Sequence, residues 1–165
     1  MCVDFTDLNK AYSKDPFPIS RIDQLVDATV IHPRMSFLDG FQGYHQIQLA
    51  LVNQEKTAFV TPTKNYHYKM ISFGLKNARS TYQGMMTRMF KSQLGKNIEV
   101  YIDNMVVKSK VVAEHVGDLG SVFKVLRKHK LRLNASKCSL SVGSGKFLAI
   151  WSPTVGLKLT LIRLK

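Results

Sequence analysis

The chain has 165 residues, 45% of them apolar, and its 24 basic side chains outnumber 11 acidic ones to give a net charge of +13. This apolar content excludes a disordered tail, and the length suits one compact domain with one buried core. Residues 1–60 hold 5 basic and 7 acidic side chains, whereas residues 61–165 hold 19 and 4. This uneven excess predicts a polyanionic partner, bound mostly by the last two thirds of the chain.

The sequence of the first third of the chain predicts short helices and strands. Val3 and Phe5 are typical of a strand directly after the first residue, so we expect a piece of the fold to be missing upstream. Prolines at 16 and 18 favour an extended run, and apolar residues spaced over 22–26 then predict a short helix. The apolar run 35–38, which ends at Asp39, predicts a strand. Further strands are predicted at 47–51, 57–60 and 66–71.

From residue 77 the hydrophobic period becomes helical. A stripe of large apolar side chains predicts a helix over 77–94 and is assigned to the core: Tyr82, Met85, Met86, Met89 and Phe90. Residues 98–101 and 105–108 predict a β-hairpin with Asp103-Asn104 as its two-residue tip, since both residues tolerate positive φ. A second amphipathic helix is predicted over 113–130. Short strands are predicted at 131–133, 138–142 and 146–150.

Counted from residue 35, this order matches the split βαβ pattern of ferredoxin-like domains, an α+β fold. In that topology the first and third strands are antiparallel neighbours, so Asp39 should lie beside Asp103 and Asn104. Paired carboxylates suit a hard cation such as Mg²⁺, and two such ions about 4 Å apart are a common device for nucleotidyl transfer. The alternative is that Asp39 and Asp103 are ordinary residues of a strand end and a turn.

Two cysteines are too few for a disulfide framework, and the five histidines show no zinc-ligand spacing. The N-terminus lacks the basic start and apolar run of a signal peptide, and no stretch approaches the roughly 18 to 20 apolar residues of a membrane span. These absences predict an intracellular protein of the cytoplasm or nucleus that does not enter a membrane.

Seven strings occur in an order and spacing that resemble the reverse transcriptase of gypsy-type LTR retrotransposons, the plant elements especially. They are CVDFTDLNKA, KDPFPISRID, SFLDGFQGYHQIQL, KTAFVTP, YHYKMISFGLKNARSTYQ, YIDNMVVKSK and LRLNASKC. The resemblance implies a polymerase palm over 35–150 with a fingers insertion around 45–75, preceded by partial fingers over 1–34. Residues 151–165 would be a remnant of the primer grip and the start of the thumb connection.

The resemblance also implies partners, cofactors and site residues. The partners are an RNA or DNA template with its primer, deoxynucleoside triphosphates, and the missing polymerase and RNase H parts of a parent polyprotein. The cofactors are two Mg²⁺ or Mn²⁺ ions, held by Asp39 and Asp103. The catalytic group is Asp39, Asp103, Asn104 and Lys137. The nucleotide-binding group is Tyr44, Phe73, Gly74 and Gln83. The nucleic-acid-binding group is Tyr101, Lys108 and Lys110.

Two of these residues have specific implied roles. Tyr44 falls at the steric-gate position, where an aromatic ring would clash with a ribose 2′-OH and so select deoxynucleotides. Lys137 is a candidate general acid for pyrophosphate departure. Each has a structural alternative, a core tyrosine for Tyr44 and a solvated strand lysine for Lys137.

Departures from the family pattern predict a weak or inactive copy. Asn104 replaces the second hairpin aspartate, and its amide oxygen adds no charge to hold Mg²⁺. Arg79 stands where the family has proline, and Ala149 and Pro153 interrupt the primer-grip string. From the resemblance we also expect the chain to begin after the triphosphate-binding fingers strand and to stop before a thumb. Open alternatives are therefore a catalytically silent nucleic-acid-binding remnant and a fragment that folds poorly.

Overall fold

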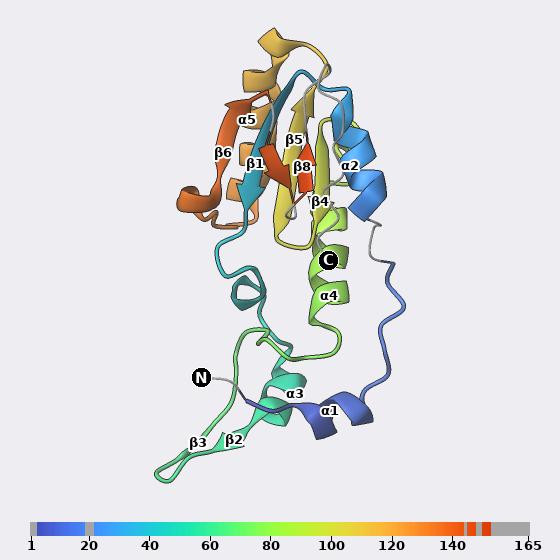
Figure 1. Ribbon diagram of the computed structural model, residues 1–165. Helices are drawn as coiled ribbons and strands as arrows, with labels where there is room; N and C mark the ends of the chain where they lie inside the picture. The colour runs from blue at the N-terminus through green and yellow to red at the C-terminus, as the bar shows by residue number, and fades with distance from the viewer. Residues whose placement is uncertain (1–2, 19–21, 144, 148–149, 153–165) are drawn as a thin grey trace.

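The computed structural model describes residues 3–18, 22–143, 145–147 and 150–152. It has a sheet with packed helices at one end and a smaller part made of short elements at the other (Figure 1). The residues predicted to form the primer grip and the thumb connection lie mostly outside the described residues: Ala149, Pro153 and most of 151–165. Within the described part, no helix combines the length and the apolar character needed to cross a membrane.

The larger part is built on a four-stranded antiparallel sheet. Its strands are β1 (Arg34–Asp39), β4 (Ile98–Tyr101), β5 (Asn104–Ser109) and β6 (Ser139–Val142). They lie in the order β4-β5-β1-β6, so the first strand of the sheet in chain order lies between the third and the fourth. β1 pairs with β5 along its whole length, from Arg34 opposite Ser109 to Asp39 opposite Asn104. The predicted split βαβ topology is confirmed.

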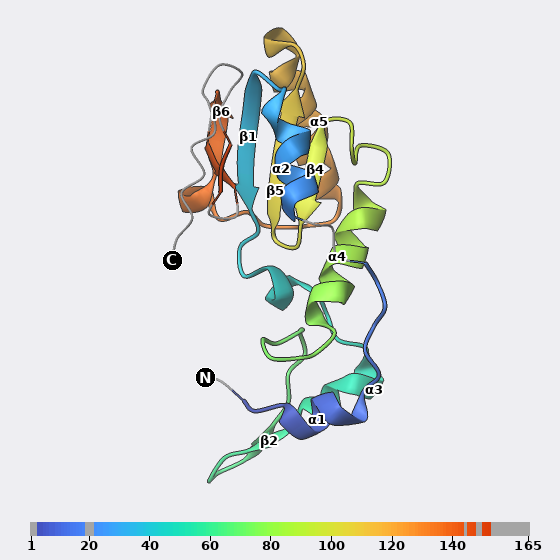
Figure 2. The same cartoon turned by 45° about the vertical axis from the view of Figure 1, so that its right-hand side comes forward.

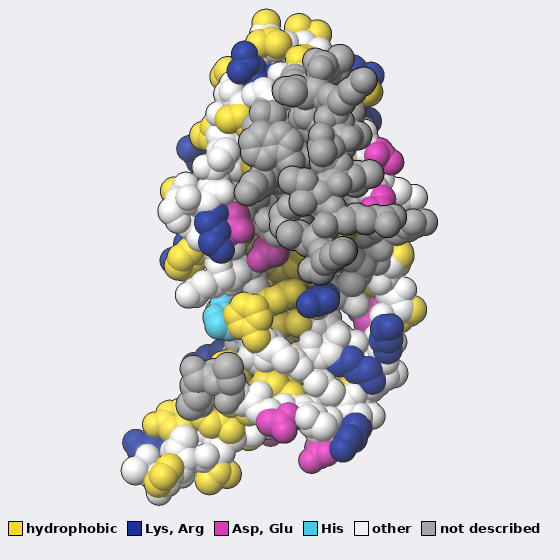
Figure 3. Space-filling view, viewed as in Figure 1, with side chains coloured by type: hydrophobic (Ala, Val, Ile, Leu, Met, Phe, Trp, Pro, Cys, Tyr) yellow, Lys and Arg dark blue, Asp and Glu magenta, His cyan; other side chains and the backbone are white. Residues whose placement is uncertain are grey.

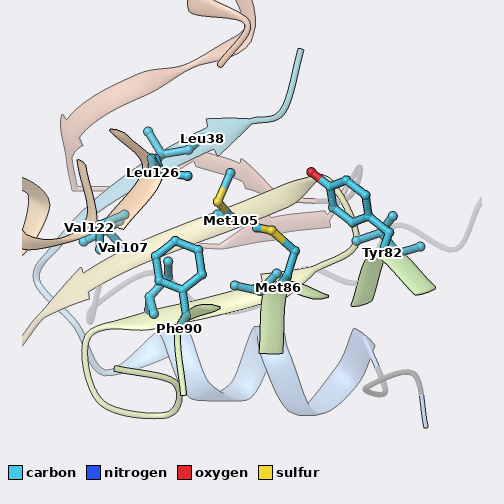
Figure 4. Close-up of a cluster of buried hydrophobic side chains, with 11 residues drawn as sticks. Leu38, Tyr82, Met86, Phe90, Met105, Val107, Val122 and Leu126 are labelled. Carbon is cyan, nitrogen blue, oxygen red and sulfur yellow. The ribbon is translucent and has the colours of Figure 1, made fainter. Parts of the chain in front are cut away.

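Helices cover both faces of this sheet. α4 (Ala78–Met89) and α5 (His115–Lys128) pack on one face. α2 (Ile22–Val30) covers the other face, where Leu25 meets side chains of β1 and β5 (Figure 2). Tyr82 and Met86 of α4 and Phe90 directly after it are four residues apart and completely buried (Figure 4). Met85 and Met89 of the predicted stripe are half-buried and pack against the same core.

The smaller part contains short helices and one two-stranded ladder. Its elements are α1 (Thr6–Ala11), η1 (Gly43–Gln46), α3 (Leu51–Gln54), η2 (Glu55–Thr57), β2 (Phe59–Val60) and β3 (Asn65–Tyr66). α1 lies beside α3, and the Tyr12 hydroxyl donates to Asn53 Oδ1 at 3.0 Å (Figures 1 and 2). The remaining short elements are η3 (Val112–Glu114), η4 (Ala135–Lys137), β7 (Gly145–Phe147) and β8 (Ile150–Ser152).

Several predicted elements differ from those observed. Phe5 is a buried residue at the start of α1 instead of a strand residue. Residues 47–51 form no strand: Gln48 makes an isolated bridge to Met70, and α3 begins at Leu51. The strands predicted at 57–60 and 66–71 shrink to β2 and β3. Residues 131–133 supply only a bridge from Leu133 to Gly40.

Candidate active site

Two carboxylates are brought to one end of the sheet by β1 and the β4–β5 hairpin. Asp39 ends β1 and lies opposite Asn104, the first residue of β5, as the topology predicts. The Gly40 N–H donates to the Asp103 carbonyl oxygen at 2.8 Å, which ties the segment leaving β1 to the hairpin tip. On the other side, the Asn134 N–H donates to the Asp39 carbonyl oxygen at 2.8 Å. Two neighbouring backbone segments therefore fix the position of Asp39.

Charged side chains close to Asp39 set the electrostatics of this end of the sheet. Burial raises the pKa of the Asp39 carboxyl, the charge of Lys137 opposes that rise, and the charge of Asp103 adds to it. Asn104 donates its amide N–H to Asp103 Oδ1 at 3.4 Å, where an aspartate would repel the same oxygen. Among the described residues, no group of three or more acidic, histidine or cysteine side chains could hold a metal ion. The candidate ligands are thus two carboxylates and one amide oxygen.

The hairpin tip is Ile102-Asp103 and not the predicted Asp103-Asn104, because Asn104 already pairs with Tyr101 across the ladder. Ile102 has a φ of 54°, a conformation that is costly for a β-branched residue. Gln83 of α4 supports this turn. Its Oε1 accepts the Ile102 N–H at 2.7 Å, and its Nε2 donates to the Val100 carbonyl oxygen at 3.1 Å.

Gln83 was predicted to bind the nucleotide, but the structure places it differently. The residue is 2% exposed, and both ends of its amide are engaged by the hairpin backbone. Gln83 therefore holds the turn that carries Asp103. Its position in the amphipathic helix gave no signal for this contact, because the hairpin lies 17 to 19 residues further along the chain.

Aromatic rings line the approach to the carboxylates. Tyr44 of η1 makes edge-to-face contacts with Phe73 and Tyr82, with ring centroids 5.3 Å and 5.7 Å apart. Burial raises the pKa of Tyr44, the charge of Asp103 raises it further, and Arg79 opposes both. Figure 3 shows hydrophobic, acidic and basic side chains meeting at the waist of the molecule, between the sheet and the smaller part.

Tyr82 was assigned to the core, yet its hydroxyl group belongs to this site. The ring is fully buried, and within the described structure the hydroxyl has no hydrogen-bond partner. A Cβ added at Gly40 or Gly43 would lie 3.0 Å or 3.1 Å from that oxygen, so these glycines make room for it. The signal available in the sequence was a tyrosine in an otherwise apolar stripe.

The predicted nucleotide-pocket residues Phe73 and Gly74 lie on the loop before α4. Phe73 is 62% exposed and contacts the rings of Tyr44 and His45. Gly74 has a φ of 92°, which only glycine adopts without strain. The loop therefore places an exposed aromatic ring beside Tyr44.

The predicted cationic residues are dispersed. Lys137, at the end of η4, is exposed and close enough to act on Asp39, and Lys110 is also exposed. Lys108 is 3% exposed, and its ammonium group lies 2.7 Å from Glu99 Oε1 and 3.0 Å from the Ala28 carbonyl oxygen. The structure therefore leaves Lys108 no free group for the predicted phosphate contact. The sequence did contain a sign of this ion pair, because Glu99 and Lys108 carry opposite charges on the two strands of the predicted hairpin.

Comparisons with known proteins agree with this architecture. The profile of a family described as "Reverse transcriptase (RNA-dependent DNA polymerase)" matches residues 1–152. A retrovirus-related Pol polyprotein from transposon 297 of Drosophila melanogaster is 29% identical over 163 residues, which are 99% of this chain and 15% of that polyprotein. An RNA-directed DNA polymerase homolog from Oenothera berteroana is 32% identical over 133 residues, covering 79% of this chain and 91% of that protein.

A similar fold occurs in solved structures. The foamy viral protease-reverse transcriptase in complex with an RNA/DNA hybrid gives a TM-score of 0.81 at 22% identity, over 88% of this chain and 20% of that one.

The Pol polyprotein of the Drosophila melanogaster transposon gypsy is a further sequence relative, 30% identical over 148 residues, or 90% of this chain and 14% of that polyprotein. The chain thus spans less than a sixth of the two transposon polyproteins.

Proposed function

The chain belongs to the reverse transcriptase (RNA-dependent DNA polymerase) family, and we propose that it is the palm and partial fingers of a retrotransposon polymerase. Residues 1–34 would be partial fingers, 35–150 the palm with a fingers insertion around 45–75, and 151–165 the start of the connection to a thumb. The break between the sheet and the smaller part supports a fingers insertion around 45–75 (Figure 1), whereas α2 of the first segment packs on the sheet. The small share of the transposon polyproteins that it covers supports a longer parent with further polymerase and RNase H parts.

The proposed reaction joins a deoxynucleotide to a primer 3′ end on an RNA or DNA template. The 3′-hydroxyl group gives up its proton to water, its oxygen forms a bond to the α-phosphorus of the incoming triphosphate, and the bond from that phosphorus to pyrophosphate breaks. Asp39 and Asp103 would hold Mg²⁺ or Mn²⁺ with help from the Asn104 amide oxygen. When bound, these ions would lower the pKa of the hydroxyl group and neutralise the leaving phosphate. Lys137 would give a proton to the departing pyrophosphate.

The ring cluster would define the nucleotide side of the site. Tyr44 would lie under the sugar and exclude a 2′-OH, and Phe73 and Gly74 would form the floor of the pocket. The edge-to-face contacts of Tyr44 with two neighbouring rings support a fixed position for the gate. Tyr101 and Lys110 would contact the nucleic acid.

One observation carries the proposal: Asp39 is in register with Asn104, directly beside Asp103. The charge of Asp103 raises the pKa of the partly buried Asp39 carboxyl, so this arrangement is costly without a cation, and cation-bound carboxylates are what nucleotidyl transfer requires. The same observation limits the activity. With Asn104 at this position, Asp39 and Asp103 are the two charged ligands that remain. The loss of a charged ligand typically costs several kcal/mol of transition-state stabilisation, which lowers the rate by a factor of about 10³ or more. This copy is therefore weak or inactive.

Primer extension on poly(rA)/oligo(dT) with Mg²⁺ or Mn²⁺ tests the proposal. We expect negligible extension by the chain and a rise of at least about tenfold in Asn104→Asp, equivalent to about 1.4 kcal/mol. Asp39→Asn in the Asn104→Asp background is the matched control and should abolish the gain. Robust extension by the unchanged chain, or a gain that does not depend on Asp39, would contradict the proposed role of the site.

A second candidate function is nucleic acid binding without catalysis. It rests on the charge of residues 61–165, where 19 basic side chains face 4 acidic ones, and not on the carboxylates. An RNA/DNA hybrid should then bind with an affinity that falls steeply as salt rises, because each phosphate contact releases counterions. Binding that is absent, or unchanged between low and high salt, would count against it.

A further inference from the structure

A groove of about 460 Å³ lies between α4 and the end of α5. Its floor is apolar and its rim is basic: the floor is Met85, Met89 and Leu131, and the rim is Arg88, Lys128 and Lys130. None of the residues assigned to the proposed polymerase site lines it. We propose that this basic groove docks an acidic amphipathic segment of a partner protein. The proposal rests on the groove itself and does not depend on polymerase activity.

The charge of the rim is not balanced within the described structure. The described ion pairs are Lys10 with Asp7 and Lys108 with Glu99, so no rim cation takes part in one. None of the acidic residues in 61–165 lines the groove. Arg88 donates its Nε–H to the Gly84 carbonyl oxygen at 3.2 Å, which holds the side chain against its own helix and leaves its terminal nitrogens to a ligand. The groove is therefore complementary to a negatively charged partner.

Lys130 occupies a backbone position where a residue other than glycine lowers the stability of the fold. α5 ends with the Leu131 N–H bonded to the Leu126 carbonyl oxygen and the Lys130 N–H bonded to that of Arg127, both at 3.0 Å. This pattern places the residue at position 130 in the left-handed region, where glycine is usual, and Lys130 has a φ of 56°. The last turn of α5 already contains Arg127 and Lys128, so the helix dipole does not require a further lysine.

The floor of the groove decides between classes of partner. Met85, Met89 and Leu131 are half-buried, and methionine side chains adapt to varied apolar surfaces. A helix with apolar side chains on one face and acidic side chains beside them would cover the floor and meet the rim. A nucleic acid strand would find a single ring, that of His129, on which to stack a base, and its phosphates would leave the floor uncovered.

The test is fluorescence anisotropy with a labelled probe peptide of about four helical turns, carrying leucines on one face and glutamates beside them. Two competitors accompany it: a scrambled peptide of the same composition, and a single-stranded oligonucleotide of the same charge. We expect the probe to bind more tightly than both. Lys128→Ala should weaken binding about threefold, as for loss of one exposed ion pair. Lys124→Ala is the matched control, because Lys124 is an exposed lysine of α5 that does not line the groove, and it should leave binding unchanged.

Lys130→Gly separates binding from folding. Removal of a non-glycine residue from the left-handed region should raise the Tm by about 2 °C, whereas loss of the rim cation should weaken the probe about threefold. A purely structural role for Lys130 would leave the affinity unchanged in this variant. That result would overturn the proposal, as would a scrambled peptide that binds as well as the probe. An oligonucleotide that displaces the probe more effectively and depends on Lys128 would assign the groove to nucleic acid instead.

Discussion

Replacement of Asn104 by aspartate changes the charge at the end of the sheet with almost no change in shape. In the observed structure the Asn104 amide donates to Asp103 Oδ1 at 3.4 Å. In Asn104→Asp this donor becomes a like charge, beside an Asp39 carboxyl whose pKa burial already raises. We therefore expect a fold that is less stable in the absence of a divalent cation and is restored when one binds.

The magnitude follows from the distance. Two unit charges 3.4 Å apart repel by about 1 kcal/mol at the dielectric constant of water and by about 5 kcal/mol at an effective value of about 20. Asp103 and Asn104 are both half-buried, so the loss should lie between these limits. A loss of about 2 kcal/mol would lower the Tm of a chain of this size by about 4 to 8 °C.

Thermal unfolding followed by circular dichroism measures this effect, first in EDTA and then with added Mg²⁺. Asn104→Asp should melt below the unchanged chain in EDTA and should gain much more from Mg²⁺, because a cation that binds only the folded state stabilises it. Asn65→Asp is the matched control, since it adds the same charge at an exposed position of β3. Equal melting temperatures in EDTA, or a Mg²⁺ response no larger than that of the control, would refute the reasoning.

Three further predictions concern buried polar groups. Gln83→Leu should lower the free energy of unfolding in urea by about 2 to 4 kcal/mol, because it leaves a buried N–H and a buried carbonyl of the hairpin unpaired. Lys108→Met should cost about 3 to 5 kcal/mol by leaving Glu99 buried without its partner, and adding Glu99→Leu should recover most of that loss. Burial lowers the pKa of His115 below its ordinary value of 6.5, so its contribution to stability is complete above pH 6.5 and is lost as the pH falls through the folded-state pKa. His115→Gln should therefore reduce the fall in Tm between pH 7 and pH 5, whereas His67→Gln, at an exposed site, should keep it.

The palm could be predicted because each of its elements buries a regular face. Tyr82, Met86 and Phe90 recur every four residues, and the helix that they define packs on the sheet as expected. Residues 47–51 show why a pattern alone is insufficient. They alternate like a half-buried strand, yet Leu51 is 76% exposed and only Gln48 finds a bridging partner. The Leu49 N–H donates to the Lys69 carbonyl oxygen and the Ile71 N–H donates to that of Ile47, but this pairing stops before Leu51, which begins α3.

The order of the strands was enough to predict which residues of the site are neighbours. Asp39 lies beside Asn104 because the first and third palm strands are neighbours, which follows from the order of the elements. The tip of the hairpin was not predictable from local preference, since Ile102 is a poor residue for positive φ and is supported by Gln83 from another element. A basic strand residue such as Lys108 is usually solvated, and its burial depends on Glu99 across the ladder.

Mn²⁺ binding, counted by electron paramagnetic resonance, tests most directly whether Asp39 and Asp103 form a cation site weakened by Asn104. The chain should bind Mn²⁺ weakly, Asp39→Asn should abolish that binding, and Asn104→Asp should tighten it by at least about tenfold, because ligand charge dominates the affinity for a hard cation. Equal Mn²⁺ binding by the chain, Asp39→Asn and Asn104→Asp would contradict the account.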